Sequence, residues 1–219
     1  MRLVLASNNA KKLAELRALF AALPVQLESQ AALGVTEADE PHRSFVENAL
    51  AKARHAARAV AGAVIADDSG LCVDALGGRP GVDSAHIATA HAPIGADREA
   101  RRAIQDAANN AWLLDQLRGV ADRRAHYICV LVAVRHALDP EPLIAAGRWF
   151  GDVLTKPQGE GGFGYDPLMR MRGMTLSVAE LDAATKNRSS HRALAAAQMA
   201  AVMRESWHLD SAGQGGRDG

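Results

Sequence analysis

The sequence predicts an α/β or α+β fold, organised as one sizeable domain or two small lobes. Apolar runs typical of strands and periodic segments typical of helices mix in both halves of the 219-residue chain. We see no internal repeat and no linker that divides them. A chain of this length buries a proper core without disulfides or metal clips. Residues 1–210 are therefore expected to form a single domain, and the Gly-rich residues 211–219 a disordered tail.

The first half of the chain is expected to begin with a strand over residues 3–6, which are all apolar. A polar turn follows, and leucines at helical spacing predict a helix over residues 11–22 that Pro24 ends. Residues 25–27 alternate like a short strand, and residues 34–41 form an acidic loop. Ser44, with Glu47 three positions later, matches the capping-box pattern and predicts a helix to about residue 61.

The second half begins with the apolar residues 63–66, which predict a strand that ends at Asp67 and Asp68. Ser69 and Gly70 are expected to form a turn, and residues 71–76 a further strand. An Ala-rich helix is expected over residues 97–117. Two apolar runs, 127–136 and 143–150, predict a pair of core strands, and the last helix should cover residues 190–204.

Charge and cysteine content narrow the class of partner. The chain has 25 basic and 25 acidic residues, and a formal net charge of zero argues against bulk electrostatic binding to nucleic acid or membranes. Cys72 and Cys129 each lie beside apolar residues, which favours small core residues in a reducing compartment. Since no run resembles a signal peptide or a spanning helix, we expect a cytoplasmic location.

Asp67 and Asp68 are the most informative pair in the sequence. Two carboxylates about 4 Å apart repel by roughly 4 kcal/mol at an effective dielectric near 20. A hard divalent cation such as Mg²⁺ is the usual way to offset that repulsion at the rim of a core. Side chains alternate along a strand, so a second ligand to the same ion must come from elsewhere, and the acidic loop could bring Glu40 toward Asp68. The alternative is a solvated turn with an Asx motif.

The segment Ser7-Asn8-Asn9-Ala10-Lys11-Lys12 lies where the first strand meets the first helix. Backbone amides at a helix start, polar side chains and Lys12 together suit a phosphate group. The alternative is an ordinary capped helix. A P-loop is excluded, because its Gly-x-x-x-x-Gly-Lys-Ser/Thr pattern is absent.

Two further segments carry candidate ligand groups. Residues 159–164 match Gly-x-Gly-x-x-Gly, but residues 165–167 do not continue as a helix, so we reject a dinucleotide fingerprint. The loop instead suits a flat ligand, with Phe163 or Tyr165 stacking and Asp166 accepting from an N–H edge; the alternative is a wide turn with a core Phe. Residues 186–192 concentrate cations and donors, or simply form a charged, capped helix start.

Taken together, these segments resemble the inosine triphosphate pyrophosphatase family. The matching pieces occur in the family's order and span residues 3–203. They are Ser7-Asn8-Asn9 with Lys12 and Glu15, residues 45–49 with Lys52 and Ala53, residues 66–71, residues 74–82, residues 162–167, and Lys186 with Ser190-His191-Arg192. Each piece is modest alone, but six in order are highly specific.

The resemblance implies an elongated α/β fold of two lobes around a mixed sheet, with the nucleotide in a cleft between the lobes. It also implies a homodimer and a Mg²⁺-dependent cut between the α and β phosphates, with Mn²⁺ a possible substitute. The substrates would be ITP, dITP and XTP, and the products a nucleoside monophosphate and pyrophosphate. The cellular role would be to keep deaminated purines out of DNA and RNA.

Residue roles follow from the same resemblance. Lys12 and the turn that includes Ser7, Asn8, Asn9, Ala10 and Lys11 should hold the triphosphate, and Lys52 should join them. Glu40 and Asp68 match metal-associated carboxylates, with Asp68 also the candidate general base, and Ser69 a phosphate or metal-shell contact. The base pocket should comprise Phe163, Gly164, Tyr165, Asp166, Lys186, His191 and Arg192.

Two alternatives remain open at this stage. One is a related pyrophosphatase that acts on pyrimidine or modified nucleotides, and the other is a nucleotide-binding module without catalysis. The sequence departs from the family pattern at Lys11, where Gly is common, and in the Ala-rich residues 92–110, which are hard to align.

Overall fold

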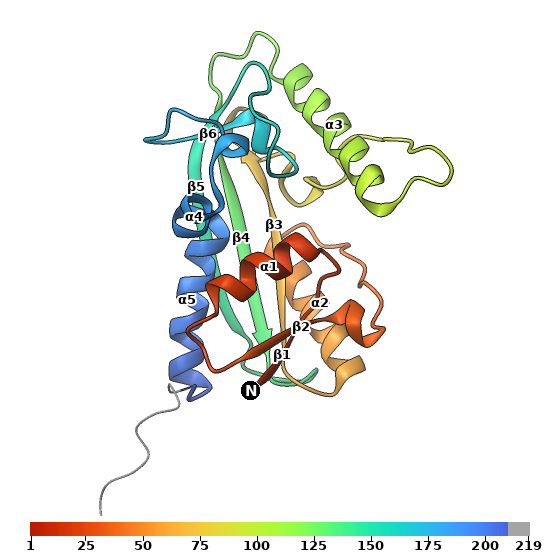
Figure 1. Cartoon of the computed structure of the whole chain (residues 1–219), viewed down its shortest axis with the longest axis vertical. Coiled ribbons are helices and arrows are strands. Elements are labelled where there is room, and N and C mark those ends of the chain that lie inside the picture. Colours follow the sequence, from red (N-terminus) through yellow and green to blue (C-terminus); the bar gives the residue numbers. More distant parts are fainter. Residues whose placement is uncertain (210–219) are drawn as a thin grey trace, which may run out of the picture. The chain divides into compact units, whose positions relative to one another are not determined.

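The computed structural model describes residues 1–209. Its six strands form one mixed sheet in the order β2-β1-β3-β4-β5-β6 (Figure 1). The strands are β1 (Arg2–Leu5), β2 (Gln26–Ser29), β3 (Val64–Val73), β4 (Arg124–Val134), β5 (Leu143–Val153) and β6 (Met169–Met171). β1 pairs in parallel with both β2 and β3, whereas β5 pairs antiparallel with β6. The expected α/β class with a mixed sheet is confirmed.

Five α-helices accompany the strands in the described part of the chain. They are α1 (Ala10–Leu19), α2 (Phe45–Val60), α3 (Arg98–Gln116), α4 (Ala183–Ser189) and α5 (His191–Ser206). The predicted caps are present: the side chain of Ser44 accepts from the amide of Glu47, and Ser190 caps α5. Asp97, for which no capping role was predicted, caps α3. No helix within residues 1–209 is both long and apolar enough to cross a membrane.

The chain divides into two compact units, each assembled from separate segments. The first comprises Met1–Asp68, Cys129–Gly147 and residues 190–209. The second comprises Ser69–Ile128 and Arg148–Ser189. The predicted tail, residues 211–219, lies outside the described residues.

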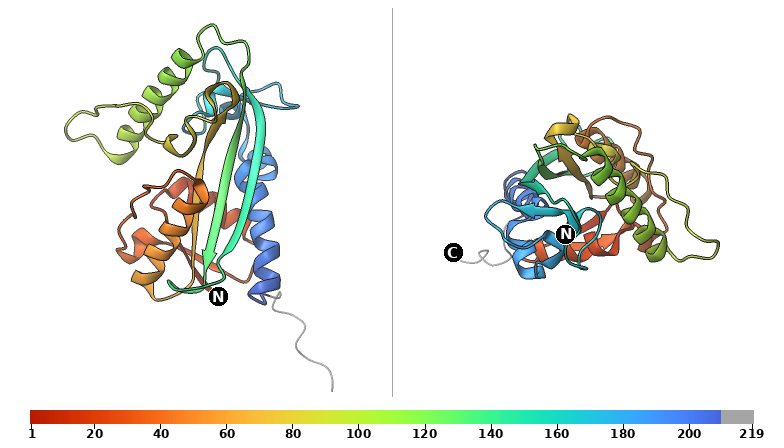
Figure 2. Two further views of the ribbon diagram at one scale, coloured as in Figure 1. Left: turned by 180° about the vertical axis from the view of Figure 1, so that it is seen from behind. Right: turned by 90° about the horizontal axis from the view of Figure 1, so that it is seen from above.

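In the first unit, strand alternation assigns side chains to two differently covered faces of the sheet. Figures 1 and 2 show α1 and α5 on one face and α2 on the other. Leu3, Leu5 and Ile65 belong to the core that Leu16 of α1 and Met199 of α5 complete. The intervening strand residues point to the opposite face, where α2 presents buried alanines. Asp67 therefore shares a face with Ile65, and Asp68 lies on the α2 side.

The second unit has its own apolar core. Leu113 and Leu117 at the end of α3 pack with Tyr127 and Trp149 from the strands and with Tyr165 from the glycine-rich loop. A helix with apolar side chains on one side buries that side and leaves its polar side for other contacts. In α3 that polar side carries Arg102, Asp106 and Asn110, whose contacts matter for the candidate site.

The main departure from expectation is β3. The predicted turn at Ser69–Gly70 is wrong, because one strand of ten residues runs from Val64 through both aspartates to Val73. Residues 74–76 form a short 3-10 helix instead of the end of a second strand. β6 and α4 were not expected. A strand can continue through two aspartates only if cations offset their charge, so the partners of these carboxylates are the next question.

Candidate active site

β3 presents Asp67 and Asp68 to different helices, as alternation predicts. Both side chains are buried, with 1% and 7% of their residue surface exposed. Asp67 contacts side chains from α1 and α5, whereas Asp68 contacts a side chain from α2. The two carboxylates therefore have separate partners although they are adjacent in sequence.

Asp68, Lys52 and Glu40 form one cluster in the first unit. Lys52 Nζ donates to Asp68 Oδ1 at 3.0 Å and to Glu40 Oε2 at 2.8 Å. Burial raises the pKa of Asp68 to about 6, aided by the negative charge of Glu40 and opposed by Lys52. Burial lowers the pKa of Lys52, but Asp68 and Glu40 outweigh it and raise that pKa overall. The acidic loop thus brings Glu40 to Asp68, as the sequence suggested.

The donor set of this cluster fits a hard divalent cation. Asp68 Oδ2 is buried and has no hydrogen-bond partner, which leaves one carboxylate oxygen for a further ligand. The ammonium group of Lys52 shows that oxygens of both carboxylates converge on one cation. Residues 1–209 contain no cluster of three or more acidic, His or Cys side chains suited to a metal ion. Two carboxylates nevertheless match Mg²⁺, which takes one or two from a protein and completes its shell with water and substrate phosphates.

Asp67 is the centre of a second, buried network. It forms ion pairs with Lys12 and with Arg192, whose Nε lies 2.9 Å from Asp67 Oδ2. Cys129 Sγ donates to the same carboxylate oxygen at 3.2 Å, and Arg192 also pairs with Glu15. Burial favours a neutral Asp67, but the charges of Arg192 and Lys12 prevail and hold its pKa well below the ordinary value. Asp67 is therefore a fixed anion that holds two cations in place.

The turn before α1 is built by its own side chains. Asn9 caps the helix, since its Oδ1 accepts from the amides of Lys11 and Lys12 at 3.0 and 3.3 Å. Ser7 Oγ accepts from the amide of Asn9 at 3.2 Å, and Asn8 Oδ1 is buried without a partner. Ala10 and Lys11 are exposed. A phosphate at this turn would compete with Asn9 for two of the amides.

Gly147 on β5 allows the first turn of α5 to pack directly against the strand. A Cβ at this position would lie 2.1 Å from the carbonyl oxygen of His191, so only glycine lets the helix start directly against the strand. This contact places His191 and Arg192 in the first turn of α5, where both are buried. Arg192, at 2% exposed, has its guanidinium engaged by acidic side chains.

Asp166 organises the glycine-rich loop of the second unit. Its carboxylate accepts from Tyr127 Oη at 3.0 Å, Lys186 Nζ at 2.7 Å and the amide of Phe163 at 3.0 Å. Gly162 makes this possible: its φ is +75°, and a Cβ there would lie 2.2 Å from Asp166 Oδ2. Both oxygens of the carboxylate thus take part in shaping the loop.

The two aromatic rings of the loop have different environments. Tyr165 is 4% exposed, lies in the core of the second unit and donates to the carbonyl of Ser84 at 3.0 Å. Phe163 is half-buried, with Lys186 Nζ 5.0 Å and Arg102 Cζ 4.8 Å from its ring centroid. Both distances lie in the cation–π range. Phe163 is therefore the ring of this loop that a flat ligand can stack on.

The candidate residues accordingly form groups within each unit. The first unit brings together Glu40, Lys52 and Asp68, and separately Lys12 with Arg192 through Asp67. The second unit brings together Phe163, Gly164, Tyr165, Asp166 and Lys186, and it also contains Ser69.

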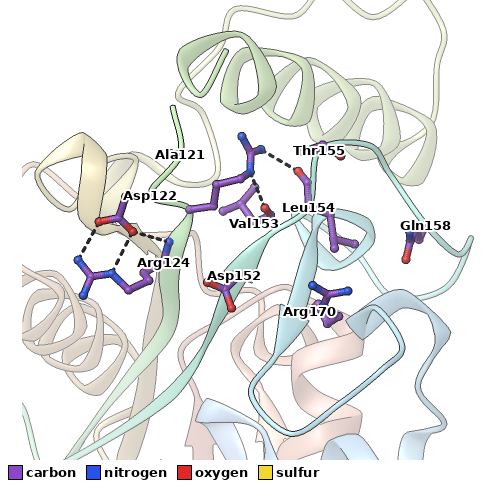
Figure 3. A pocket seen from close by; sticks show the side chains of 10 residues that line it. Ala121, Asp122, Arg124, Asp152, Val153, Leu154, Thr155, Gln158 and Arg170 are labelled. Atoms are coloured by element: carbon purple, nitrogen blue, oxygen red, sulfur yellow. Dashed lines mark hydrogen bonds and ion pairs between the residues drawn. The ribbon is translucent and has the colours of Figure 1, made fainter. Parts of the chain in front are cut away.

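A polar cavity of about 490 Å³ lies elsewhere in the second unit (Figure 3). Arg123 and Arg124 line it, but the guanidinium of each already donates to other groups of the protein. Arg123 donates to the carbonyls of Val153 and Leu154 at 2.6 and 2.8 Å, and Arg124 pairs with Asp122 at 2.7 Å. None of the candidate residues lines this cavity, so we do not assign the ligand site to it.

Comparisons with known proteins identify the family of this chain. A model of the Ham1 family matches residues 3–202. The chain belongs to the Ham1 family. It is 66% identical over 207 residues to the dITP/XTP pyrophosphatase of Methylibium petroleiphilum, covering 94% of this chain and 99% of that protein. It is 64% identical over 211 residues to the dITP/XTP pyrophosphatase of Leptothrix cholodnii, covering 95% and 100%.

A solved structure supports the same membership. The HAM1 protein of Coxiella burnetii superposes with a TM-score of 0.81 at 37% sequence identity, covering 94% of this chain and 99% of that one. Family membership thus confirms the resemblance stated from the sequence motifs.

Several residues that shape the site escaped the sequence analysis. Three residues of α3 contact the glycine-rich loop: Arg102, Asp106 and Asn110. Two strand residues donate to aspartates, Tyr127 to Asp166 and Cys129 to Asp67. The spacing of four between the α3 residues was a usable signal, because such residues share a helix face. For Tyr127 and Cys129 only the three-dimensional structure identifies the partner.

Proposed function

We propose that this chain is a nucleoside triphosphate pyrophosphohydrolase that cleaves ITP, dITP and XTP to the monophosphate and pyrophosphate. The carrying observation is the Asp68–Glu40–Lys52 cluster, where a buried carboxylate with a raised pKa lies beside a second carboxylate and a lysine. A lysine, and a cation that the two carboxylates would hold, are the groups needed to position a triphosphate and neutralise its charge. The names of two relatives, both dITP/XTP pyrophosphatases, support dITP and XTP as substrates.

In this proposal Asp68 accepts or orients the proton of the attacking water. A carboxyl group whose pKa is near 6 is better matched to that task at neutral pH than one near 4. The bond between the α and β phosphates breaks, pyrophosphate leaves, and the proton of the water passes to the carboxylate. Glu40 and Asp68 would hold Mg²⁺, with Mn²⁺ as a substitute, and the ion would neutralise phosphate charge.

Lysines and the turn before α1 supply the remaining phosphate contacts. Lys52 is already directed at the carboxylate pair, and Lys12 is held by Asp67. We expect Ser7, Asn8 and Asn9, together with Ser69, to contact phosphate or metal-bound water. Because Arg192 is engaged by Asp67 and Glu15, we assign it the positioning of Lys12 through Asp67.

The base is assigned to the glycine-rich loop and to His191. Phe163 offers the stacking ring, and Lys186 lies beside it. Hypoxanthine and xanthine carry an oxygen at C6 where adenine carries an amino group. An N–H donor of His191 would form a hydrogen bond with that oxygen. With adenine bound, the same donor would have no acceptor, and a buried donor left without an acceptor can lower kcat/KM for the wrong substrate by up to about 10⁴–10⁵.

A substrate panel tests the proposal. Pyrophosphate release would be measured with Mg²⁺ for ITP, dITP, XTP, ATP, GTP and pyrimidine triphosphates, using wild type, Asp68→Asn and the surface control Asp115→Asn. We expect ITP, dITP and XTP to be cleaved fastest, with loss of turnover only in Asp68→Asn. Faster cleavage of pyrimidine nucleotides would favour the alternative pyrophosphatase, and binding without turnover would indicate a non-catalytic module.

Two further expectations follow from the family resemblance. We propose that the enzyme is a homodimer, which light scattering coupled to gel filtration would measure. We also propose that it acts in the cytoplasm on the free nucleotide pool, so that loss of the gene would raise the level of deaminated purines in cellular nucleotides.

A further inference from the structure

Helix α3 holds the glycine-rich loop through side chains spaced four residues apart. Asp106 Oδ2 accepts from the amide of Gly164 at 2.7 Å, and Asn110 Nδ2 donates to the carbonyl of Gly164 at 3.0 Å. Both backbone groups of Gly164 are thus fixed by one helix. Arg102, one turn earlier on the same face, lies over the ring of Phe163. The helix therefore fixes the loop and adds a cation to its only stacking ring.

Arg102 differs from the other cation at this ring. Lys186 is ion-paired with Asp166 at 2.7 Å, so its charge is largely offset. Arg102 has no ion pair among residues 1–209, and it is half-buried. The charged groups that contact the ring of Phe163 or the backbone of Phe163 and Gly164 are Arg102, Asp106, Lys186 and Asp166. Glu160 in the loop and Glu180, which packs against Gly159, add negative charge at the other end of the loop. Of the two cations at the ring of Phe163, Lys186 is paired with a carboxylate and Arg102 is not, within the part of the chain that the structure describes.

A planar guanidinium over an aromatic ring is also within reach of a base stacked on that ring. The guanidinium carbon is 4.8 Å from the ring centroid, and stacked aromatic rings have centroids about 4.5–7 Å apart. A base that stacks on the face of Phe163 that Arg102 covers must therefore contact the guanidinium or displace it by only a few ångströms. Arginine stacks on flat π-systems and keeps its charge at all relevant pH values.

We propose that Arg102 is a specificity-determining residue that lies against the purine base and favours xanthine over hypoxanthine. This inference rests on the proposed function, in which the base stacks on Phe163. Xanthine carries an additional oxygen at C2 and loses a ring proton near neutral pH, whereas hypoxanthine stays neutral until alkaline pH. A fixed positive charge beside the base stabilises the anionic xanthine ring and leaves hypoxanthine nearly unaffected.

The test compares kcat/KM for XTP and ITP between pH 5.5 and 8.5. The variants are Arg102→Gln, Arg102→Lys, and the control Arg118→Gln just beyond the same helix, whose side chain is exposed. In wild type and the control, the XTP-to-ITP ratio should rise with pH as xanthine ionises. In Arg102→Gln the ratio at pH 8 should fall about fivefold and its pH dependence should flatten, while Arg102→Lys should keep most of both.

The outcomes separate this inference from the proposed function. Wild type that cleaves neither XTP nor ITP overturns both. Wild type that cleaves both, with an unchanged ratio in Arg102→Gln, overturns only the role of Arg102. An equal loss for both substrates would also overturn it, because that result indicates a structural role. If thermal denaturation shows that Arg102→Gln does not fold, Arg102→Met replaces it, because methionine removes the charge and keeps an apolar stem. The XTP-to-ITP ratio of kcat/KM in Arg102→Met then tests the role of Arg102 in the same way.

Discussion

Replacing Asp68 with asparagine should abolish turnover and at the same time stabilise the metal-free protein. Asp68 is buried, and its pKa is raised from 3.8 to about 6 by burial and by Glu40, against the opposing effect of Lys52. A rise of that size corresponds to roughly 3 kcal/mol against the ionised form in the folded state. Asparagine has nearly the same shape and carries no charge, so the variant avoids this cost.

The upward direction of the pKa shift of Asp68 determines the pH range over which the stability of the protein changes. The folded state holds a proton on Asp68 between about pH 4 and 6, where the unfolded state has released it. The stability of wild type should therefore fall as the pH rises through this window, and the deficit should be complete above pH 6. Because Asp68→Asn also weakens one contact of Lys52, we expect a net gain of about 1–3 kcal/mol above pH 7 and none below pH 4.

Urea denaturation in a chelator at several pH values measures this prediction. Wild type, Asp68→Asn and the surface control Asp115→Asn would be compared under identical conditions, followed by the same series with Mg²⁺. Added Mg²⁺ should stabilise wild type and the control but not Asp68→Asn. A difference in unfolding free energy that is independent of pH, or a less stable Asp68→Asn at pH 8, would refute the electrostatic reasoning.

Three other substitutions have equally definite outcomes. Asp67→Asn removes the buried charge that Lys12 and Arg192 share and should lower the unfolding free energy at pH 7 by about 3–5 kcal/mol in urea titrations. The loss should shrink below about pH 4, where the unfolded wild-type chain takes up a proton on Asp67 that the folded protein does not; equal stability of the two proteins at pH 7 would contradict this. Gly147→Ala brings a methyl group 2.1 Å from the carbonyl oxygen of His191 and should cost about 1–3 kcal/mol in thermal unfolding, so an unchanged melting temperature would count against the close contact. Tyr127→Phe removes the buried 3.0 Å donor to Asp166 and should cost about 1–3 kcal/mol and raise KM for the nucleotide, whereas an unaltered KM would separate this bond from substrate binding.

Helix starts were predictable from sequence because their determinants are local. Ser44, Asp97 and Ser190 each cap a helix within three residues of the groups they bind. The two core strands of the second half were also predictable, because long apolar runs leave few alternatives. In the candidate site, the approach of Glu40 to Asp68 could be suggested from sequence because a single acidic loop precedes α2.

The course of β3 could not be predicted from local preferences. Asp, Ser and Gly are disfavoured in strands, so the segment after Ala66 has the composition of a turn. The strand continues because Lys12 and Arg192 offset the charge of Asp67 and Lys52 offsets that of Asp68. Arg192 lies 125 positions from Asp67 along the chain. No local pattern can report a partner at that distance.

The opposite environments of Asp67 and Asp68 explain how one strand supplies two kinds of carboxylate. Asp67 faces two cations, which hold its pKa well below the ordinary value, whereas Asp68 is paired with a lysine that it shares with Glu40, and its pKa is raised to about 6. Pairs of titratable groups whose pKa values are pushed apart mark a division between fixed charge and proton transfer. Because side chains alternate along β3, a step of one residue is enough to move from one environment to the other. Exchanging the roles of the two aspartates would require exchanging the helices that cover the two faces, so the division of labour is a property of the fold and not of either residue.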